Sequence, residues 1–289
     1  MSWRTVVITK TAKLDYSMGY MVVRDVESTA KIHISEISVL VVESTAVSVT
    51  AALLNELINK KVKVMFCDDK HNPSFELPPY YASHDCSLKL KRQISWNKTV
   101  KQFVWTQIVV EKIKNQAAVL DYYKLEQSSQ LMEYIEEIEL NDKTNREGHA
   151  AKVYFNALFG KGFSRSDDCP VNAALNYGYS IILSIFNREV AASGYLTQLG
   201  LFHDNMFNQY NLSCDLMEPF RPFVDLTVRE MNPMKFDKEE KLQIYAMLSE
   251  EIRIDGRTQT FINAIKIYCK SIFAAIEEND ISLIRFACR

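Results

Sequence analysis

The sequence predicts an α+β protein in which a small N-terminal β-rich domain precedes a larger helical domain. Residues 1–78 contain short runs rich in β-branched residues, several of them alternating between apolar and polar positions. After residue 86 the apolar residues recur with a helical period instead. Between these regions, residues 67–81 contain three prolines, which can continue neither a helix nor a central strand.

The first domain is expected to form a hairpin and a buried strand. Gly19 is the expected turn between strands at residues 13–16 and 20–23, and the continuous apolar run at 38–42 is typical of a buried strand. The remaining expected elements of this domain are strands at 3–8, 31–34 and 62–66 and a short helix at 50–60.

The second domain is expected to be all-α. Pro233 and Gly256 punctuate its last helices. The expected helices are 86–117, 119–139, 145–160, 171–195, a segment starting near 213, 238–252 and 258–277. The predicted limits are therefore 1–78 for the β-rich domain, 79–85 for a linker and 86–289 for the helical domain.

Composition excludes several protein classes. The six cysteines are scattered without a CxxC pair, which predicts reduced thiols in a cytoplasmic protein. The N-terminal residues have no apolar core of a signal peptide, and no apolar run is long enough to cross a membrane. GxxxxGK[ST], GxGxxG and HExxH motifs are also absent, which argues against nucleotide-binding loops and zincins.

Three segments of the second half contain the candidate metal ligands. Glu147, His203 and Glu218 offer two carboxylates and an imidazole, and Asp215 lies close to Glu218 in the chain. Such a set suits a divalent cation acting on phosphate oxygens, where charge builds up in the transition state. The sequence therefore predicts a metal site for phosphodiester chemistry.

Each candidate also has a structural interpretation. Thr144 and Glu147 fit a capping box, in which the glutamate closes a helix N-terminus. Asp215 and Glu218 fit a second capping box, or Glu218 forms an exposed ion pair with Arg221. A single histidine is more often a core or surface residue than a ligand. The spacing alone leaves these alternatives open.

Residues 84–120 are basic, with seven Lys and Arg residues against two acidic ones. Trp96 and Trp105 lie among them. This stretch is either a solvated helix face with core tryptophans or a surface that binds a phosphate backbone.

The order of four sequence blocks resembles the integrase family of CRISPR spacer acquisition, the first-numbered Cas proteins. The blocks are Glu147–Gly148 with Ala150, Ala151 and Tyr154; Asp168 with the run from Pro170 to Tyr179; Gly194 with Gly200–Leu201–Phe202–His203; and the run from Asp215 to Pro222. The segment from Phe66 to Tyr81 further resembles the type II subtype, which accompanies a single large RNA-guided effector nuclease.

The resemblance implies a β-rich N-terminal dimerisation domain and a helical catalytic domain. It implies that Glu147, His203 and Glu218 bind Mg²⁺ or Mn²⁺ and are catalytic, with Asp215 near them and Asn172 in support. Some relatives have Asp at the position of Glu218. The implied reaction is attack by the 3′-hydroxyl of a captured DNA fragment on the backbone of a CRISPR repeat.

The implied partners are double-stranded DNA (prespacer and repeat), a second copy of the chain and a small ferredoxin-like second Cas protein. Two dimers of the chain would flank one dimer of that protein in a heterohexamer, and the effector nuclease and other adaptation proteins are further candidates. The residues expected to contact DNA are Lys89, Lys91, Arg92, Lys98, Arg146 and Arg221. Two alternatives remain: a metal-dependent nuclease that does not join strands, and a non-enzymatic DNA-binding scaffold whose carboxylates are helix caps.

Overall fold

The computed structural model describes residues 4–78 and 83–288. Internal contacts divide the chain into two compact units, Met1–Ala82 and Ser83–Arg289, which we call unit 1 and unit 2. Residues 79–82 of the predicted linker lie outside the described residues. Within the described residues, no helix is both long and apolar enough to cross a membrane.

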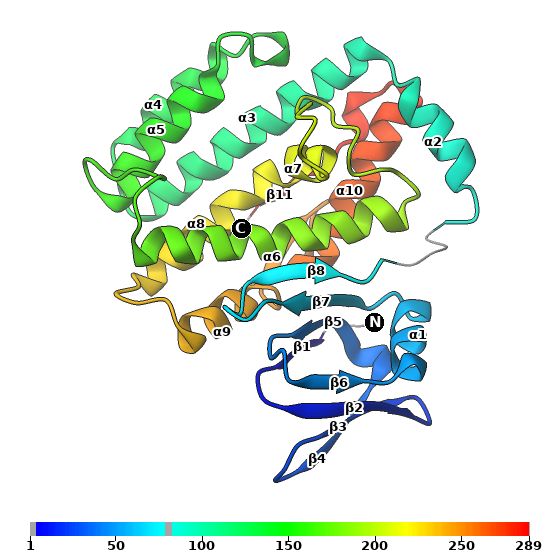
Figure 1. Ribbon diagram of the computed structural model, residues 1–289. Coiled ribbons are helices and arrows are strands. Elements are labelled where there is room, and N and C mark those ends of the chain that lie inside the picture. The colour runs from blue at the N-terminus through cyan, green and yellow to red at the C-terminus, as the bar shows by residue number, and fades with distance from the viewer. Residues whose placement is uncertain (1–3, 79–82, 289) are drawn as a thin grey trace. The chain divides into compact units, whose positions relative to one another are not determined.

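Unit 1 contains two four-stranded sheets, β1-β5-β7-β8 and β4-β3-β2-β6 (Figure 1). Its elements are β1 (Arg4–Ile8), β2 (Ala12–Ser17), β3 (Tyr20–Arg24), β4 (Thr29–His33), β5 (Ile37–Val42), β6 (Val47–Val49), α1 (Ala51–Asn59), β7 (Lys63–Cys67) and β8 (Pro73–Glu76). β5 is buried along its whole length and pairs in parallel with β1 and β7, as expected for a continuous apolar strand.

The predicted hairpin at Gly19 is confirmed. β2 and β3 pair antiparallel from Ser17 opposite Tyr20 outward, and both turn residues, Met18 and Gly19, have positive φ. β6 and β8 are not among the strands that the sequence predicted. β6 has only three residues, and β8 begins with Pro73 at the edge of its sheet, one of the few positions where a strand tolerates proline.

Unit 2 is mainly helical, with α4 and α5 lying beside α3 (Figure 1). Its helices are α2 (Cys86–Ile94), α3 (Lys98–Tyr122), α4 (Gln127–Glu136), α5 (Arg146–Phe159), α6 (Pro170–Ala192), α7 (Asn211–Met217), α8 (Arg221–Met231), α9 (Lys238–Met247) and α10 (Phe261–Glu278). A 3-10 turn, η3 (Glu218–Phe220), connects α7 to α8.

The predicted basic helix 86–117 is wrong: it is two helices, α2 and α3. The Asn97 side chain accepts hydrogen bonds from the backbone N–H groups of Thr99 and Val100 and so begins α3. α3 then continues to Tyr122 into the segment predicted as the next helix. Apolar residues continue at helical spacing on both sides of residues 95–97, with Trp96 between them. Only the capping residue Asn97 therefore indicates the break.

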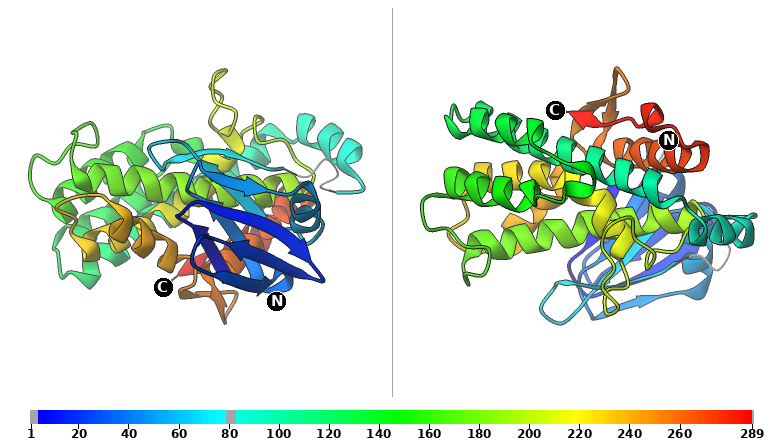
Figure 2. Two further views of the ribbon diagram at one scale, coloured as in Figure 1. Left: turned by 60° about the horizontal axis from the view of Figure 1, so that its bottom comes forward. Right: turned by 90° about the horizontal axis from the view of Figure 1, so that it is seen from above.

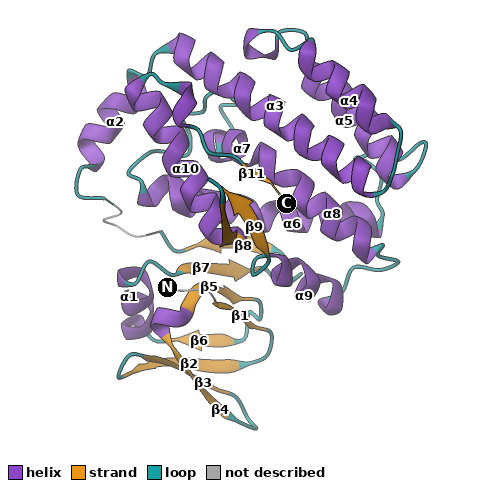
Figure 3. Ribbon diagram, turned by 180° about the vertical axis from the view of Figure 1, so that it is seen from behind, coloured by secondary structure: helices purple, strands orange, loops and turns teal. Residues whose placement is uncertain are grey.

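The prediction of an all-α second domain is also wrong. β9 (Glu251–Ile254), β10 (Arg257–Thr260) and β11 (Ala287–Cys288) form a three-stranded sheet in the order β10-β9-β11, beside α10 (Figure 3). Asp255 and Gly256, both with positive φ, form the turn of the β9–β10 hairpin. The sequence predicts a break between two helices at this position.

Close helix packing in unit 2 requires glycine at position 178. A Cβ on Gly178 of α6 would overlap a methyl group of Val224 on α8. We expect Gly178→Ala to lower the free energy of unfolding by about 1–3 kcal/mol, the usual cost of overpacking a core. Urea denaturation monitored by circular dichroism measures it.

The control is Val224→Ala in the same background, which removes the obstructing methyl group. We expect the double variant to be more stable than the sum of the two single effects allows, because the clash is the shared cause. Strict additivity would contradict the packing account.

Candidate active site

Glu147 lies in the first turn of α5, but it does not cap that helix. The backbone N–H groups of Arg146 and Glu147 donate instead to the Asp142 carboxylate, at 2.8 and 3.1 Å. Thr144 is not the N-cap residue, and its hydroxyl oxygen is buried without a hydrogen bond. The predicted capping box is therefore wrong, and the Glu147 side chain is available for another role.

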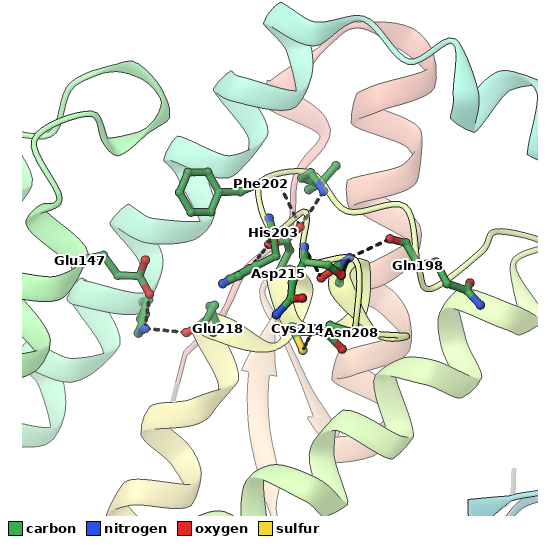
Figure 4. A network of polar contacts seen from close by, with 12 residues as sticks. Glu147, Gln198, Phe202, His203, Asn208, Cys214, Asp215 and Glu218 are labelled. Atoms are coloured by element: carbon green, nitrogen blue, oxygen red, sulfur yellow. Dashed lines mark hydrogen bonds and ion pairs between the residues drawn. The ribbon is translucent and has the colours of Figure 1, made fainter. Parts of the chain in front are cut away.

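The Glu147 side chain meets Glu218 at one ammonium group. Lys112 of α3 places its Nζ 2.5 Å from Glu147 Oε1 and 2.5 Å from Glu218 Oε2. The ion pairs drawn from Glu147 and Glu218 converge on this nitrogen (Figure 4). Two of the predicted ligands, distant in the sequence, thus share one cation.

Glu218 is a buried charge at a break between helices. Pro219 and Pro222 have no backbone N–H, and the chain passes from α7 through η3 into α8 here, as the two prolines predicted. The Glu218 side chain is 4% exposed. Its Oε1 lies 2.9 Å from Arg221 Nε, so the predicted pair with Arg221 exists but is not exposed.

Two cations keep Glu218 ionised. Burial acts to raise the pKa of the Glu218 carboxyl, but Arg221 and Lys112 outweigh it and the pKa is lowered. Burial likewise acts to lower the pKa of the Lys112 ammonium, and Glu218 and Glu147 reverse that effect. The contact of Glu218 Oε2 with the Lys112 ammonium is an ion pair at 2.5 Å whose angles depart from those of a standard hydrogen bond.

Asp215 organises the loop that carries His203. It is fully buried, and its carboxylate accepts hydrogen bonds from the backbone N–H groups of Leu201, Phe202 and His203, at 2.6, 3.0 and 3.1 Å. Gly200 permits this approach, because a Cβ there would lie 2.8 Å from Asp215 Oδ2 and closer still to the carbonyl oxygen of His203. Asp215 is thus a positioning residue, and it does not cap α7.

The His203 ring is fixed by Asp215 and by aromatic neighbours. Its Nδ1 lies 2.5 Å from Asp215 Oδ1, which leaves Nε2 for a further ligand. The hydrogen bond with Asp215 raises the pKa of His203 against partial burial, and the charges of Glu218 and Glu147 add to the effect. Phe202 stacks on Trp105 of α3 at 4.5 Å between ring centroids, and the His203 ring meets Trp105 edge-on.

A cleft opens beside His203. It has a volume of about 310 Å³ and is lined by α2, by Lys101 of α3 and by the chain from Leu199 to Asp204. The loop between α6 and α7 that forms one of its walls stands out from the helices of unit 2 (Figure 2). The cleft thus offers access to His203 from solvent, with a lysine along its wall.

Asn172 serves the connection between α5 and α6. Its Nδ2 donates to the carbonyl oxygens of Ser164 and Asp167, both at 2.8 Å, and its Oδ1 accepts from Arg165. The described contacts do not join it to the three predicted ligands. Asn172 thus holds the α5–α6 connection together with Arg165, and its support of the site stays a prediction.

The residues predicted to bind DNA are dispersed. Lys89 pairs with Asp85 at 3.4 Å, and Arg92 pairs with Glu277 at 2.8 Å. Arg146 pairs with Glu137 at 2.9 Å, and Arg221 belongs to the buried charge cluster. Lys91 is exposed on α2, and Lys98 is exposed at the start of α3.

The donor atoms fit a hard divalent cation, but their arrangement is not a finished metal site. Carboxylate oxygens with one imidazole nitrogen suit Mg²⁺ or Mn²⁺, and Glu218 Oε2 is a buried acceptor without a hydrogen bond. Among the described residues, however, no three His, Cys, Asp or Glu side chains are placed to hold an ion together. Lys112 stands between the two carboxylates, and the assignment of Glu147, His203 and Glu218 as ligands stays a prediction.

Comparison with known proteins identifies the family. The family model described as CRISPR associated protein Cas1 matches residues 5–254. The chain belongs to the Cas1 family. A curated relative from Neisseria meningitidis serogroup C (strain 8013), named CRISPR-associated endonuclease Cas1, is 34% identical over 97% of this chain and 94% of its own length. Another of that name from Pyrobaculum aerophilum is 28% identical over 82% of this chain and 86% of its own.

Solved structures share the fold. A Cas1 protein from Thermotoga maritima superimposes with a TM-score of 0.75 at 16% identity, covering 95% of this chain and 97% of its own. A casposase bound to integration product superimposes with a TM-score of 0.77 at 16% identity, covering 97% of this chain and 92% of its own. The chain is thus a member of an enzyme family whose curated relatives are named endonucleases.

Sequence reasoning missed Lys112 and Asp142. Lys112 was counted among the basic residues of a nucleic-acid-binding or solvated face, but its side chain is only 10% exposed. A signal was present: Ile108 and Val109, four and three residues before Lys112, are apolar, and this spacing puts Lys112 on the inner side of α3.

Removal of the Asp215 charge should loosen the His203 loop. We expect Asp215→Asn to lower the free energy of unfolding by about 1–3 kcal/mol, because an amide replaces one acceptor oxygen with a donor facing backbone N–H groups. Urea denaturation measures the change. Asp204→Asn, at an exposed position beside His203, is the matched control and should be neutral. Equal stability of the two variants would refute the role of Asp215.

Asp225 should make stability depend on pH. Burial raises the pKa of Asp225 from 3.8 to about 6, although Tyr179 donates a hydrogen bond to it. Between these values the folded protein keeps a proton that the unfolded chain releases, so stability falls as pH rises through this window. Asp225→Asn cannot ionise. Its stability relative to wild type should therefore rise by up to about 3 kcal/mol across the window and then stay level.

Thermal or urea denaturation from pH 4 to pH 8 in steps, without added metal, tests this prediction. Asp121→Asn on the exposed side of α3 is the control, and its difference from wild type should not follow the same curve. A pH-independent difference for Asp225→Asn would show that the carboxylate is ionised throughout.

Proposed function

We propose that this protein is a metal-dependent DNA integrase of CRISPR adaptation, which joins the 3′-hydroxyl ends of captured DNA fragments to the repeat of a CRISPR array by transesterification. The observation that carries the proposal is the meeting of Glu147 and Glu218 at one cation position, together with a His203 ring that Asp215 orients. In a chain of the Cas1 family, this is the set of groups that phosphodiester chemistry needs.

Each residue would have a distinct role. Glu147, Glu218 and His203 Nε2 would hold Mg²⁺ or Mn²⁺, which when bound supplies positive charge for the scissile phosphate. Arg221 would keep Glu218 ionised and oriented from the other side. Asp215 would fix the His203 ring so that Nε2, and not Nδ1, faces the other ligands.

The proposed substrate is double-stranded DNA, and the proposed partners are a second copy of the chain and the second Cas protein. Related folds support this: one is titled a TtCas1–DNA complex (TM-score 0.53, 14% identity), and another is part of a Cas6-RT-Cas1–Cas2 complex (TM-score 0.72, 15% identity). Lys101 in the cleft beside His203 and the exposed Lys91 and Lys98 supply positive charge for a phosphate backbone.

Strand joining is favoured over hydrolysis alone because the casposase with a similar fold is described with an integration product. The scaffold alternative required the carboxylates to cap helix N-termini, and in the described contacts neither the Glu147 nor the Glu218 side chain does so. The type II subtype is part of the proposal and rests on the segment from Phe66 to Tyr81, of which residues 79–81 lie outside the described residues.

A strand-transfer assay tests the function. It combines a short duplex, a supercoiled plasmid with a CRISPR repeat, Mn²⁺, the small partner protein and wild type or a variant. We expect Glu147→Gln, Glu218→Gln and His203→Asn each to lower the joining rate by at least about 100-fold, because each loses a group that supports charge in the transition state. Glu133→Gln on the exposed side of α4 is the matched control and should join at the wild-type rate.

The products separate the alternatives. Nicked plasmid without joined product would favour the nuclease. Equal joining by wild type and Glu218→Gln would remove Glu218 from the catalytic set, and DNA binding without any reaction under these conditions would favour the scaffold.

A further inference from the structure

Lys112 is a buried lysine that no part of the proposed reaction uses. It projects from the middle of α3, its side chain is 10% exposed, and its ammonium lies 2.5 Å from one oxygen of Glu147 and 2.5 Å from one of Glu218. These are two of the three groups to which a divalent cation is assigned. The ammonium therefore occupies the position between the carboxylates that the cation would need.

Charge explains why a lysine is found there. Two carboxylates at one partly dehydrated position repel each other, and a cation between them removes that repulsion. Lys112 supplies one positive charge and a divalent ion supplies two. Both cations cannot lie between the same oxygens, since they would repel each other at contact distance.

The two contacts of the ammonium are unequal. It donates a hydrogen bond to Glu147, whereas its 2.5 Å approach to Glu218 Oε2 departs from standard hydrogen-bond angles. Lysine also has a flexible stem of four methylene groups, and a small rotation carries the charge away. Arg221 stays on the other oxygen of Glu218, so the carboxylate keeps its place when Lys112 leaves.

We propose that Lys112 is an internal counter-ion of the metal-free site, and that a divalent cation binds Glu147 and Glu218 by displacing its ammonium group. Lys112 thereby sets the metal affinity: it stabilises the folded protein without metal and weakens metal binding. This inference rests on the proposed function, because it takes the assignment of Glu147 and Glu218 as ligands from it.

Metal binding by the full-length protein tests the proposal without an activity assay. Titration with Mn²⁺, followed by the electron paramagnetic resonance signal of the free ion, gives the dissociation constant. We expect Lys112→Met to bind Mn²⁺ at least about fivefold more tightly than wild type, the lower end of usual coupling between two ligands. Lys112→Arg keeps the charge and should bind no more tightly than wild type.

Lys114→Met is the matched control. It lies on the same helix, its side chain is 50% exposed, and its ion pair with Glu111 is long at 3.9 Å. It removes the same charge from the same helix without touching the site, so its Mn²⁺ affinity should equal that of wild type.

Thermal melting gives a second readout that a structural role alone would not produce. Without metal, Lys112→Met should melt at a lower temperature than wild type, because the carboxylates lose their counter-ion. With saturating Mn²⁺ it should gain more stability than wild type does, because its affinity is higher. A variant that melts without cooperativity is replaced by Lys112→Gln, which is measured in the same way.

Other results would overturn the proposal in distinct ways. Weaker Mn²⁺ binding by Lys112→Met would show that the lysine organises the ligands and does not compete with the ion, and unchanged binding would show that its ammonium does not oppose the ion. Glu147→Gln and Glu218→Gln separate this failure from that of the proposed function. If both bind Mn²⁺ as wild type does, the ligand assignment itself is wrong. If both lose binding while Lys112→Met is unchanged, only the counter-ion role falls.

Discussion

The buried charge of Glu218 constrains the rest of the candidate site. A carboxylate that is 4% exposed stays ionised only with compensation, and the protein supplies Arg221 on one oxygen and Lys112 near the other. Lys112 also reaches Glu147, so the requirement of one buried charge joins α3, α5 and the α7–α8 connection. Without these cations the two acidic residues would repel each other.

The segment from the end of α7 through η3 also positions His203. Only the three residues of η3 separate α7 from α8, with Pro219 in η3 and Pro222 in the first turn of α8. Asp215 at the end of α7 and Glu218 in η3 are therefore three residues apart but have different tasks. The Asp215 carboxylate accepts hydrogen bonds from the backbone N–H groups of the His203 loop, whereas the Glu218 carboxylate contacts Lys112. A break in helical geometry thus allows one segment both to orient the imidazole and to provide a carboxylate.

Family membership and geometry support the integrase proposal in different ways. The match to the Cas1 family model covers most of the chain and establishes the family, and solved structures at low identity share the fold. The role of individual groups comes from the contacts: carboxylates that do not cap helices, an oriented imidazole and a solvent-accessible cleft beside it. The absence of capping by these carboxylates weakens the scaffold alternative.

Local sequence determined much of the fold. Alternation and β-branched residues specified most strands of unit 1, Gly19 specified its hairpin, and the two prolines after Glu218 specified the helix break, because these signals act between neighbours in the chain. The sequence also determined which acidic residues and which histidine belong to the candidate site, through the order of their motifs.

The sequence did not determine which side chains pair in space. Lys112 and Glu147 pair only because α3 packs beside α5, so a lysine in a basic stretch became a buried counter-ion, and Asp142 replaced Thr144 as the cap of α5. Burial and charge pairing depend on residues distant in sequence, and only the tertiary structure decides them.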